Sequence, residues 1–140
     1  MRARSLVTSL VVLLTRLAAP VGAQITRLEV SIPYEFTVGT RMLAAGQYLI
    51  HRPVPADSHV LGFRGNLKHQ KAVVTTSAKT SEAPAADTEL TFARYGDAYF
   101  LRSIRVRGAR EFYELPMSKT EHAAAANGGA TVVTLKVESR

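Results

Sequence analysis

The strongest constraint on the fold is a period-two alternation of apolar and polar residues in short runs along most of the chain. Side chains on a β-strand point alternately to its two faces, so such runs predict strands that bury one face. Gly and Pro separate many of the runs, and these residues favour turns. The sequence therefore predicts short strands joined by tight turns.

Seven to nine strands are expected from this pattern. They fall in the segments 26–32, 35–38, 47–52, 59–63, 71–77, 88–107 (two strands), 111–115 and 131–137. Between them, Leu43–Gly46 reads as a turn. The segment 79–87 is polar and small, which is typical of a mobile loop or hairpin tip rather than a domain linker.

The segment 88–107 is predicted to form a β-hairpin around Gly96-Asp97, a pair that suits a type II′ turn. Two registers are open. A two-residue loop puts one set on a common face: Leu90, Phe92, Tyr99 and Leu101. A three-residue loop with a bulge groups a different set: Leu90, Phe92, Phe100, Ile104 and Val106. We favour the three-residue loop because it gives the cleaner buried face.

One short helix is predicted in the C-terminal half. Ser118 and Glu121 have the spacing of a capping box, in which each side chain accepts a backbone N–H at the helix start. Alanines follow, and Asn127-Gly128-Gly129 ends the helix. Together with the strands, this predicts a mainly β fold, an antiparallel β-sandwich with one short α-helix; a small closed β-barrel is the alternative.

The first 23 residues have the layout of a secretory signal peptide. Arg2 and Arg4 precede the apolar run 6–14, and Val21-Gly22-Ala23 offers small residues for cleavage before Gln24. Arg16 departs from the pattern by interrupting the apolar region, and it leaves a stretch too short to span a bilayer. We therefore expect a signal peptide at 1–23, a single β-rich domain at 24–140 and a mature chain without a transmembrane segment.

Cleavage would change the meaning of the charge. The chain has a net charge of +7, and three arginines but no acidic residue would leave with residues 1–23, so the mature chain carries +4. That value is ordinary for a soluble domain and argues against a nucleic-acid partner. The absence of Cys excludes disulfides, thiolate metal sites and a Cys nucleophile.

No catalytic constellation stands out in the sequence. The four His residues lack the paired spacing of metal ligands, and no glycine-rich phosphate loop is present. We therefore expect no metal, no cofactor and a non-enzymatic role. The alternative is a small secreted enzyme or inhibitor acting on an envelope polymer, which would need two of Glu35, His51, Asp97 and Glu114 in one pocket.

Arginines and tyrosines gather around the hairpin and form the candidate binding surface. Its members are Arg94, Tyr95, Tyr99, Arg105, Arg107 and Arg110. Such a patch could bind an anionic polymer, a weaker alternative function. The competing interpretation is a solvated strand face whose charges prevent edge-to-edge aggregation, and we favour it.

Three segments carry a resemblance to known sequences. Leu43–Tyr48 resembles an LPAGxY signature with Ala44 in place of Pro, 94–101 resembles an RYGDxYFL hairpin, and 114–121 resembles an ELPxSxxE segment before an Ala-rich helix. In order and spacing they are similar to a family of small, secreted, β-rich bacterial proteins of uncharacterised activity. The resemblance implies no catalytic residue or cofactor.

Taken together, the sequence predicts an exported, non-enzymatic β-sandwich. We expect it in the periplasm or the medium, as an envelope-associated or extracellular binding or structural module. An envelope polymer or another envelope protein is the expected kind of partner.

Overall fold

The structure, a computed structural model, describes residue 25 and residues 27–54 and 59–138. The predicted signal peptide and its cleavage site lie outside the described residues. Ile25 is buried, and its backbone N–H donates to the Tyr113 hydroxyl at 3.3 Å.

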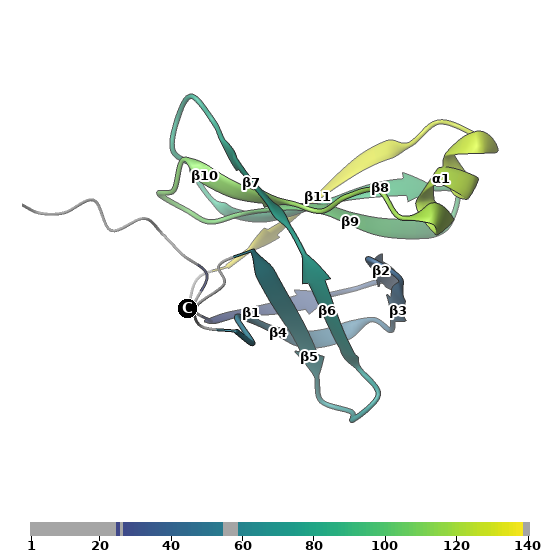
Figure 1. The fold of residues 1–140 in the computed structure, drawn as a ribbon, viewed down its shortest axis with the longest axis horizontal. Coiled ribbons are helices and arrows are strands. Elements are labelled where there is room, and N and C mark those ends of the chain that lie inside the picture. Colours follow the sequence, from purple (N-terminus) through teal and green to yellow (C-terminus); the bar gives the residue numbers. More distant parts are fainter. Residues whose placement is uncertain (1–24, 26, 55–58, 139–140) are drawn as a thin grey trace, which may run out of the picture.

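Two β-sheets face each other, as Figure 1 shows. The smaller sheet has the order β1-β4-β5-β6 and the larger one β11-β8-β9-β10-β7, with the β2–β3 hairpin joined to β9 through the parallel pair Thr37–Phe100. The smaller sheet contains β1 (Arg27–Ile32), β4 (Gly46–His51), β5 (Val60–Gly65) and β6 (Lys71–Thr75). The larger sheet contains β2 (Phe36–Val38), β3 (Arg41–Leu43), β7 (Ser77–Thr80), β8 (Thr88–Tyr95), β9 (Ala98–Arg105), β10 (Glu111–Glu114) and β11 (Thr131–Val137).

Nearly all pairings are antiparallel, and the described strands form two sheets rather than one closed cylinder. The predicted β-sandwich is therefore confirmed, and the alternative of a closed barrel is wrong. The sandwich core lies between the sheets. Its largest fully buried side chains are Phe36, Phe63, Phe92, Ile32, Leu43, Ile50, Leu61, Leu90, Ile104, Leu115 and Val38.

One long stretch of chain crosses from the smaller sheet into the larger, as β6 runs on into β7 (Figure 1). Thr76 lies between the two strands and is buried, with its backbone N–H and its hydroxyl both donating to the His59 carbonyl at 2.7 and 2.9 Å. These bonds satisfy the polar groups of a strand that changes sheets. The prediction that residues 79–87 form only a loop is therefore wrong at its start, because Lys79 and Thr80 pair with β10.

A second strand missing from the sequence prediction is β3. Residues 41–43 pair with β2, so the predicted turn at Leu43–Gly46 is confined to Ala44 and Ala45. The Tyr48 hydroxyl donates to the Ala44 carbonyl at 2.6 Å and fixes this turn to the next strand.

The β8–β9 hairpin has a two-residue loop, because Tyr95 pairs with Ala98 across Gly96 and Asp97. Gly96 has φ +60°, which is typical of the first central residue of a type II′ turn. Our preference for the three-residue loop is therefore wrong.

A bulge in the middle of β9 explains the error. Thr91 pairs with Ser103 and Phe92 with Leu101, which leaves Arg102 as an extra residue. The bulge reverses the alternation of β9, so Leu101 and Ile104 both face the core although they are three residues apart. The sequence pattern that suggested a longer loop comes from this bulge.

Replacing Gly96 by valine should destabilise the protein, whereas replacing Asp97 by asparagine should not. Space is not the obstacle, because no atom lies within 4 Å of a Cβ built on Gly96. The cost comes from the left-handed backbone, which a β-branched residue resists, and we expect about 1–2 kcal/mol in the free energy of unfolding. Urea denaturation would measure it, and equal midpoints for the two variants would contradict this turn.

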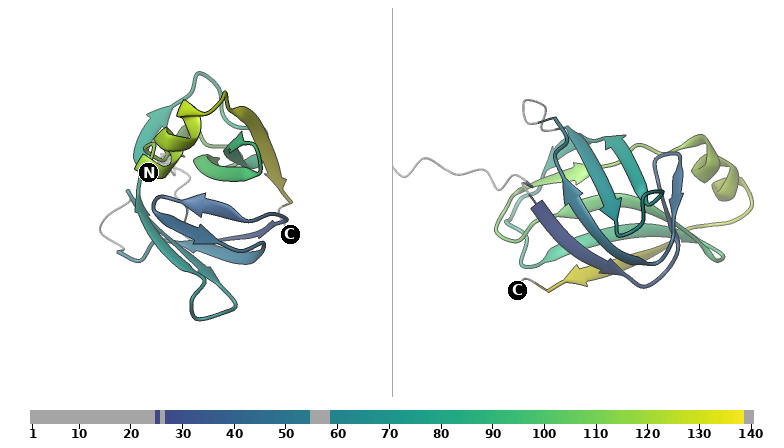
Figure 2. Two further views of the ribbon diagram at one scale, coloured as in Figure 1. Left: turned by 90° about the vertical axis from the view of Figure 1, so that its right-hand side faces the viewer. Right: turned by 90° about the horizontal axis from the view of Figure 1, so that it is seen from below.

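The predicted helix is confirmed as α1 (Lys119–Ala126). The Ser118 hydroxyl accepts the Glu121 backbone N–H at 3.2 Å, as the capping box predicts. The Glu121 carboxylate, however, accepts from Tyr95 and Arg102 of the hairpin instead of from the helix backbone. This residue thus joins α1 to the hairpin end of the larger sheet, where Figure 2 shows the helix.

Candidate functional site

The six residues of the candidate binding surface do not form one surface. Arg94 and Tyr95 are consecutive on β8 and therefore point to opposite faces of the larger sheet. Arg94 shares its face with the buried Phe92, whereas Tyr95 lies on the face covered by α1. The grouping expected from sequence proximity is therefore divided by the sheet itself.

Arg94 and Tyr99 are a cross-strand pair at the hairpin end. The Arg94 Nε donates to the Gly96 carbonyl at 2.7 Å, a guanidinium nitrogen lies 3.8 Å from an Asp97 carboxylate oxygen, and the guanidinium carbon is 5.5 Å from the centre of the Tyr99 ring. Tyr99 in turn stacks on Tyr34 with ring centres 3.8 Å apart. These contacts use both side chains to brace the turn.

Tyr95 belongs to a buried polar cluster with Arg102 and Glu121. The Tyr95 hydroxyl donates to one carboxylate oxygen of Glu121 and an Arg102 nitrogen to the other, both at 3.3 Å. The Glu121 side chain is 3% exposed and that of Arg102 29% exposed. Burial, together with the Glu121 carboxylate, raises the pKa of Tyr95, so the phenol keeps its proton and acts as a donor.

The remaining three residues lie toward the other end of β9. Arg105 follows the core residue Ile104 and therefore points to the outer face, where its guanidinium carbon lies 4.4 Å from the centre of the Phe112 ring. Arg107 and Arg110 are exposed. The backbone N–H of Arg107 donates to the Thr88 hydroxyl, and the Arg110 carbonyl accepts from Ser81.

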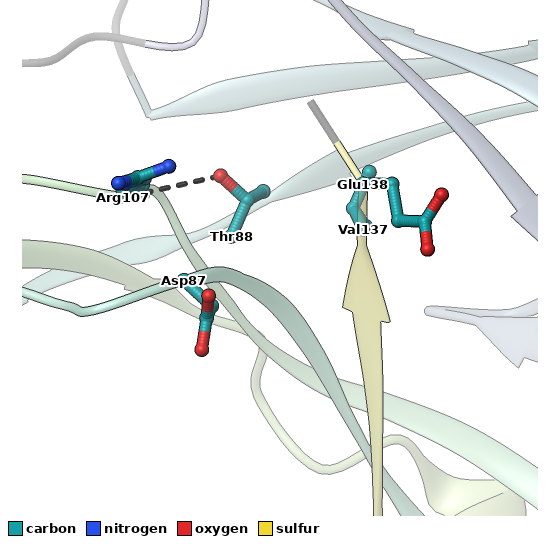
Figure 3. A pocket seen from close by; sticks show the side chains of 5 residues that line it. All are labelled: Asp87, Thr88, Arg107, Val137 and Glu138. Carbon is teal, nitrogen blue, oxygen red and sulfur yellow. Dashed lines mark hydrogen bonds between the residues drawn. The ribbon is translucent and has the colours of Figure 1, made fainter. Parts of the chain in front are cut away.

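A shallow hollow of about 330 Å³ lies at the rim of the larger sheet, lined by Asp87, Thr88, Arg107, Val137 and Glu138. Figure 3 shows the two carboxylates pointing in different directions, and Asp87 is paired with Lys136 at 3.4 Å. Catalysis requires polar groups that converge on one reacting atom, and these side chains do not converge.

A second concentration of positive charge lies on the outer face of the smaller sheet, which the sequence did not reveal. Arg27 pairs with His51 and His51 with Gly62, and the neighbouring row places Arg64 beside Lys71. A Cβ on Gly62 would lie 2.8 Å from the His51 ring, so the imidazole rests over the bare glycine backbone.

The positive charges on this surface affect the protonation of His51. Burial lowers the pKa of His51, and the neighbouring Arg64 and Arg27 guanidinium groups lower it further. Glu29 on β1 is the acidic side chain nearby and lies 4.0 Å from Arg27. At neutral pH the imidazole is therefore neutral and the arginines carry the charge.

The residues of the enzyme alternative lie on separate elements. Glu35 is exposed between β1 and β2, His51 ends β4, Asp97 is in the hairpin turn and Glu114 ends β10. Asp97 contacts Arg94, and the electrostatic neighbours of His51 are arginines. In the described ranges, no group of three His, Asp or Glu side chains is placed to hold a metal ion.

No helix among residues 27–54 and 59–138 could reach across a lipid bilayer. Comparison with family models, with curated proteins and with solved structures found no match to this chain.

Proposed function

We propose that this chain is an exported, non-enzymatic β-sandwich module that acts in the cell envelope or outside the cell, in a binding or structural role. The observation that carries the proposal is the distribution of its side chains. Apolar and aromatic residues from both sheets fill the space between them, and the charged residues lie mainly on the outer faces and in the turns. We therefore infer a role carried by the outer faces of the sheets.

Export is supported by the signal-like layout of residues 1–23. Cleavage after Ala23 would leave Ile25, a buried residue of the core, in the mature chain. A domain without cysteine also needs no oxidant to fold after export, because its stability rests on the core alone.

The test is expression of the full chain with a C-terminal tag in a bacterium, followed by cell fractionation and N-terminal sequencing. The proposal predicts a periplasmic or secreted protein that begins at Gln24. A cytoplasmic protein that begins at Met1 would overturn it. A variant with Ala23 replaced by arginine serves as the control, because it should block cleavage.

A second candidate function is the binding of an anionic polymer, and the cationic face of the smaller sheet supports it better than the hairpin does. On the hairpin surface, Arg94 and Arg105 are engaged by a carbonyl, a carboxylate or an aromatic ring, and the exposed Arg107 and Arg110 lie beyond the end of β9. Arg64 and Lys71, by contrast, are exposed cross-strand neighbours on the outer face of the smaller sheet. Clustered exposed cations are what phosphate- or sulfate-rich polymers bind.

Heparin affinity chromatography distinguishes the two surfaces. The double variant Arg64→Ser with Lys71→Ser should elute at lower salt than Arg105→Ser with Arg107→Ser, although each removes two positive charges. Affinity for a polyanion falls with each cation lost from the contact surface, whereas charges elsewhere contribute little. Equal elution of both variants would reject a specific role for the smaller sheet.

A further inference from the structure

The edge strand β11 differs from the other sheet edges of the protein. Among the described strands it pairs only with β8, and Figure 2 shows it as the outermost strand of the larger sheet. All seven of its residues pair with β8 without a register shift. An edge of this length exposes a row of backbone N–H and C=O groups that another strand can pair with.

The other edges are protected against such pairing or, as with β3, are only three residues long. β1 carries the exposed charges of Arg27 and Glu29 and is followed by Pro33. The continuous edge formed by β6 and β7 carries the exposed Lys71 and Lys79. Charged side chains and proline are the usual means by which proteins prevent edge-to-edge association.

β11 has little of this protection. Its sequence, TVVTLKV, contains no proline or glycine and is rich in β-branched residues, and Val132 is 71% exposed. Its one charged residue, Lys136, lies near one end and 3.4 Å from the Asp87 carboxylate, so most of the strand is uncharged. The edge is therefore suited to accept a further strand.

We propose that β11 binds β11 of a second copy of this chain, antiparallel, about a two-fold axis at Thr134. In this register Thr134 lies opposite itself, Val133 of one copy lies opposite Leu135 of the other, and Val132 lies opposite Lys136. Residues of equal parity face the same side in both copies, because side chains alternate along each strand.

The composition of the strand favours a second copy as the occupant. Val133 and Leu135 are half-buried and pack against the core of their own copy, so the two-fold pairing extends each core across the junction. The register also avoids any like-charge contact, since each Lys136 meets a valine. A strand of seven residues spans only about 23 Å, so the interface is small and the dimer should depend on concentration.

Cross-linking tests the register. Because the native sequence has no cysteine, each introduced thiol can react only with another introduced thiol. Thr134→Cys should give a covalent dimer upon oxidation or with a short dimaleimide, because the two thiols lie opposite each other. Val132→Cys alone should give at least tenfold less, since its two thiols would lie about 13 Å apart along the strands. A mixture of Val132→Cys and Lys136→Cys should cross-link again, as a heterodimer. Equal yields from Thr134→Cys, Val132→Cys and the similarly exposed Val73→Cys would overturn the register.

Sedimentation equilibrium of the exported protein, over a hundredfold range of concentration, tests the dimer itself. Val132→Lys should weaken dimerisation at least tenfold, because the introduced lysine faces Lys136 of the other copy. Val132→Glu should maintain or strengthen dimerisation, and Val73→Lys, at a site 67% exposed on the smaller sheet, should leave it unchanged. An unmodified protein that stays monomeric throughout, or equal effects of Val132→Lys and Val132→Glu, would overturn the proposal.

Discussion

Replacing Phe92 by alanine should lower the free energy of unfolding by about 3–5 kcal/mol, the largest single-residue effect expected in this chain. Phe92 is completely buried on β8. The rings of Tyr34, Phe36 and Tyr99 approach it edge-on, with centres at 5.2, 5.9 and 6.5 Å. Alanine would remove the transfer energy of the ring and leave a cavity among three aromatic neighbours that are held by other contacts.

The measurement is urea denaturation monitored by circular dichroism. Because a loss of this size approaches the whole stability of a small domain, Phe92→Leu is a necessary second variant, with an expected loss of about 1–2 kcal/mol. The exposed Val73→Thr, on β6 of the smaller sheet, serves as the control and should change stability by less than about 0.5 kcal/mol. If Phe92→Leu lowered the free energy of unfolding by less than the control does, that result would contradict the central position of Phe92 in the core.

Much of this core could be predicted from the sequence, because the alternation of apolar residues is local information. The runs at β4 and β11 place Tyr48 with Ile50, and Leu135 with Val137, on the buried side, as the structure has them. The bulge at Arg102 could not be predicted in this way. Its extra residue, Arg102, contacts Glu121, which comes from a helix later in the chain and so is not local information.

The candidate site was less predictable than the fold. A cluster in sequence is not a cluster in space when the segment is a strand, and so Arg94 and Tyr95 diverge. Conversely, the cationic face around His51 combines residues from four strands of the smaller sheet, and their register is set by tertiary packing. The motif resemblance and the proposed export stay predictions, because the described part of the fold tests neither.

Replacing Arg102 by methionine should lower the free energy of unfolding by about 2–3 kcal/mol, although Arg102 is a strand residue with a partly exposed side chain. The variant keeps the apolar stem and removes the cation that faces Glu121. The Glu121 carboxylate would stay almost fully buried, and the Tyr95 hydroxyl would remain as a donor to it. An uncompensated buried charge costs more than the loss of the hydrogen bond alone.

A double-mutant cycle separates this charge effect from a simple loss of packing. Glu121→Gln should cost less than Arg102→Met, because the partly exposed guanidinium left behind can reach water while the amide keeps the shape of the carboxylate. Adding Glu121→Gln to Arg102→Met should recover part of the loss, which gives a coupling energy of about 1–2 kcal/mol. Arg105→Met, which removes an arginine from the same strand without exposing a buried acid, should cost less than about 1 kcal/mol. Strictly additive effects of the two substitutions would mean that the bulge, and not the ion pair, positions α1 against the hairpin.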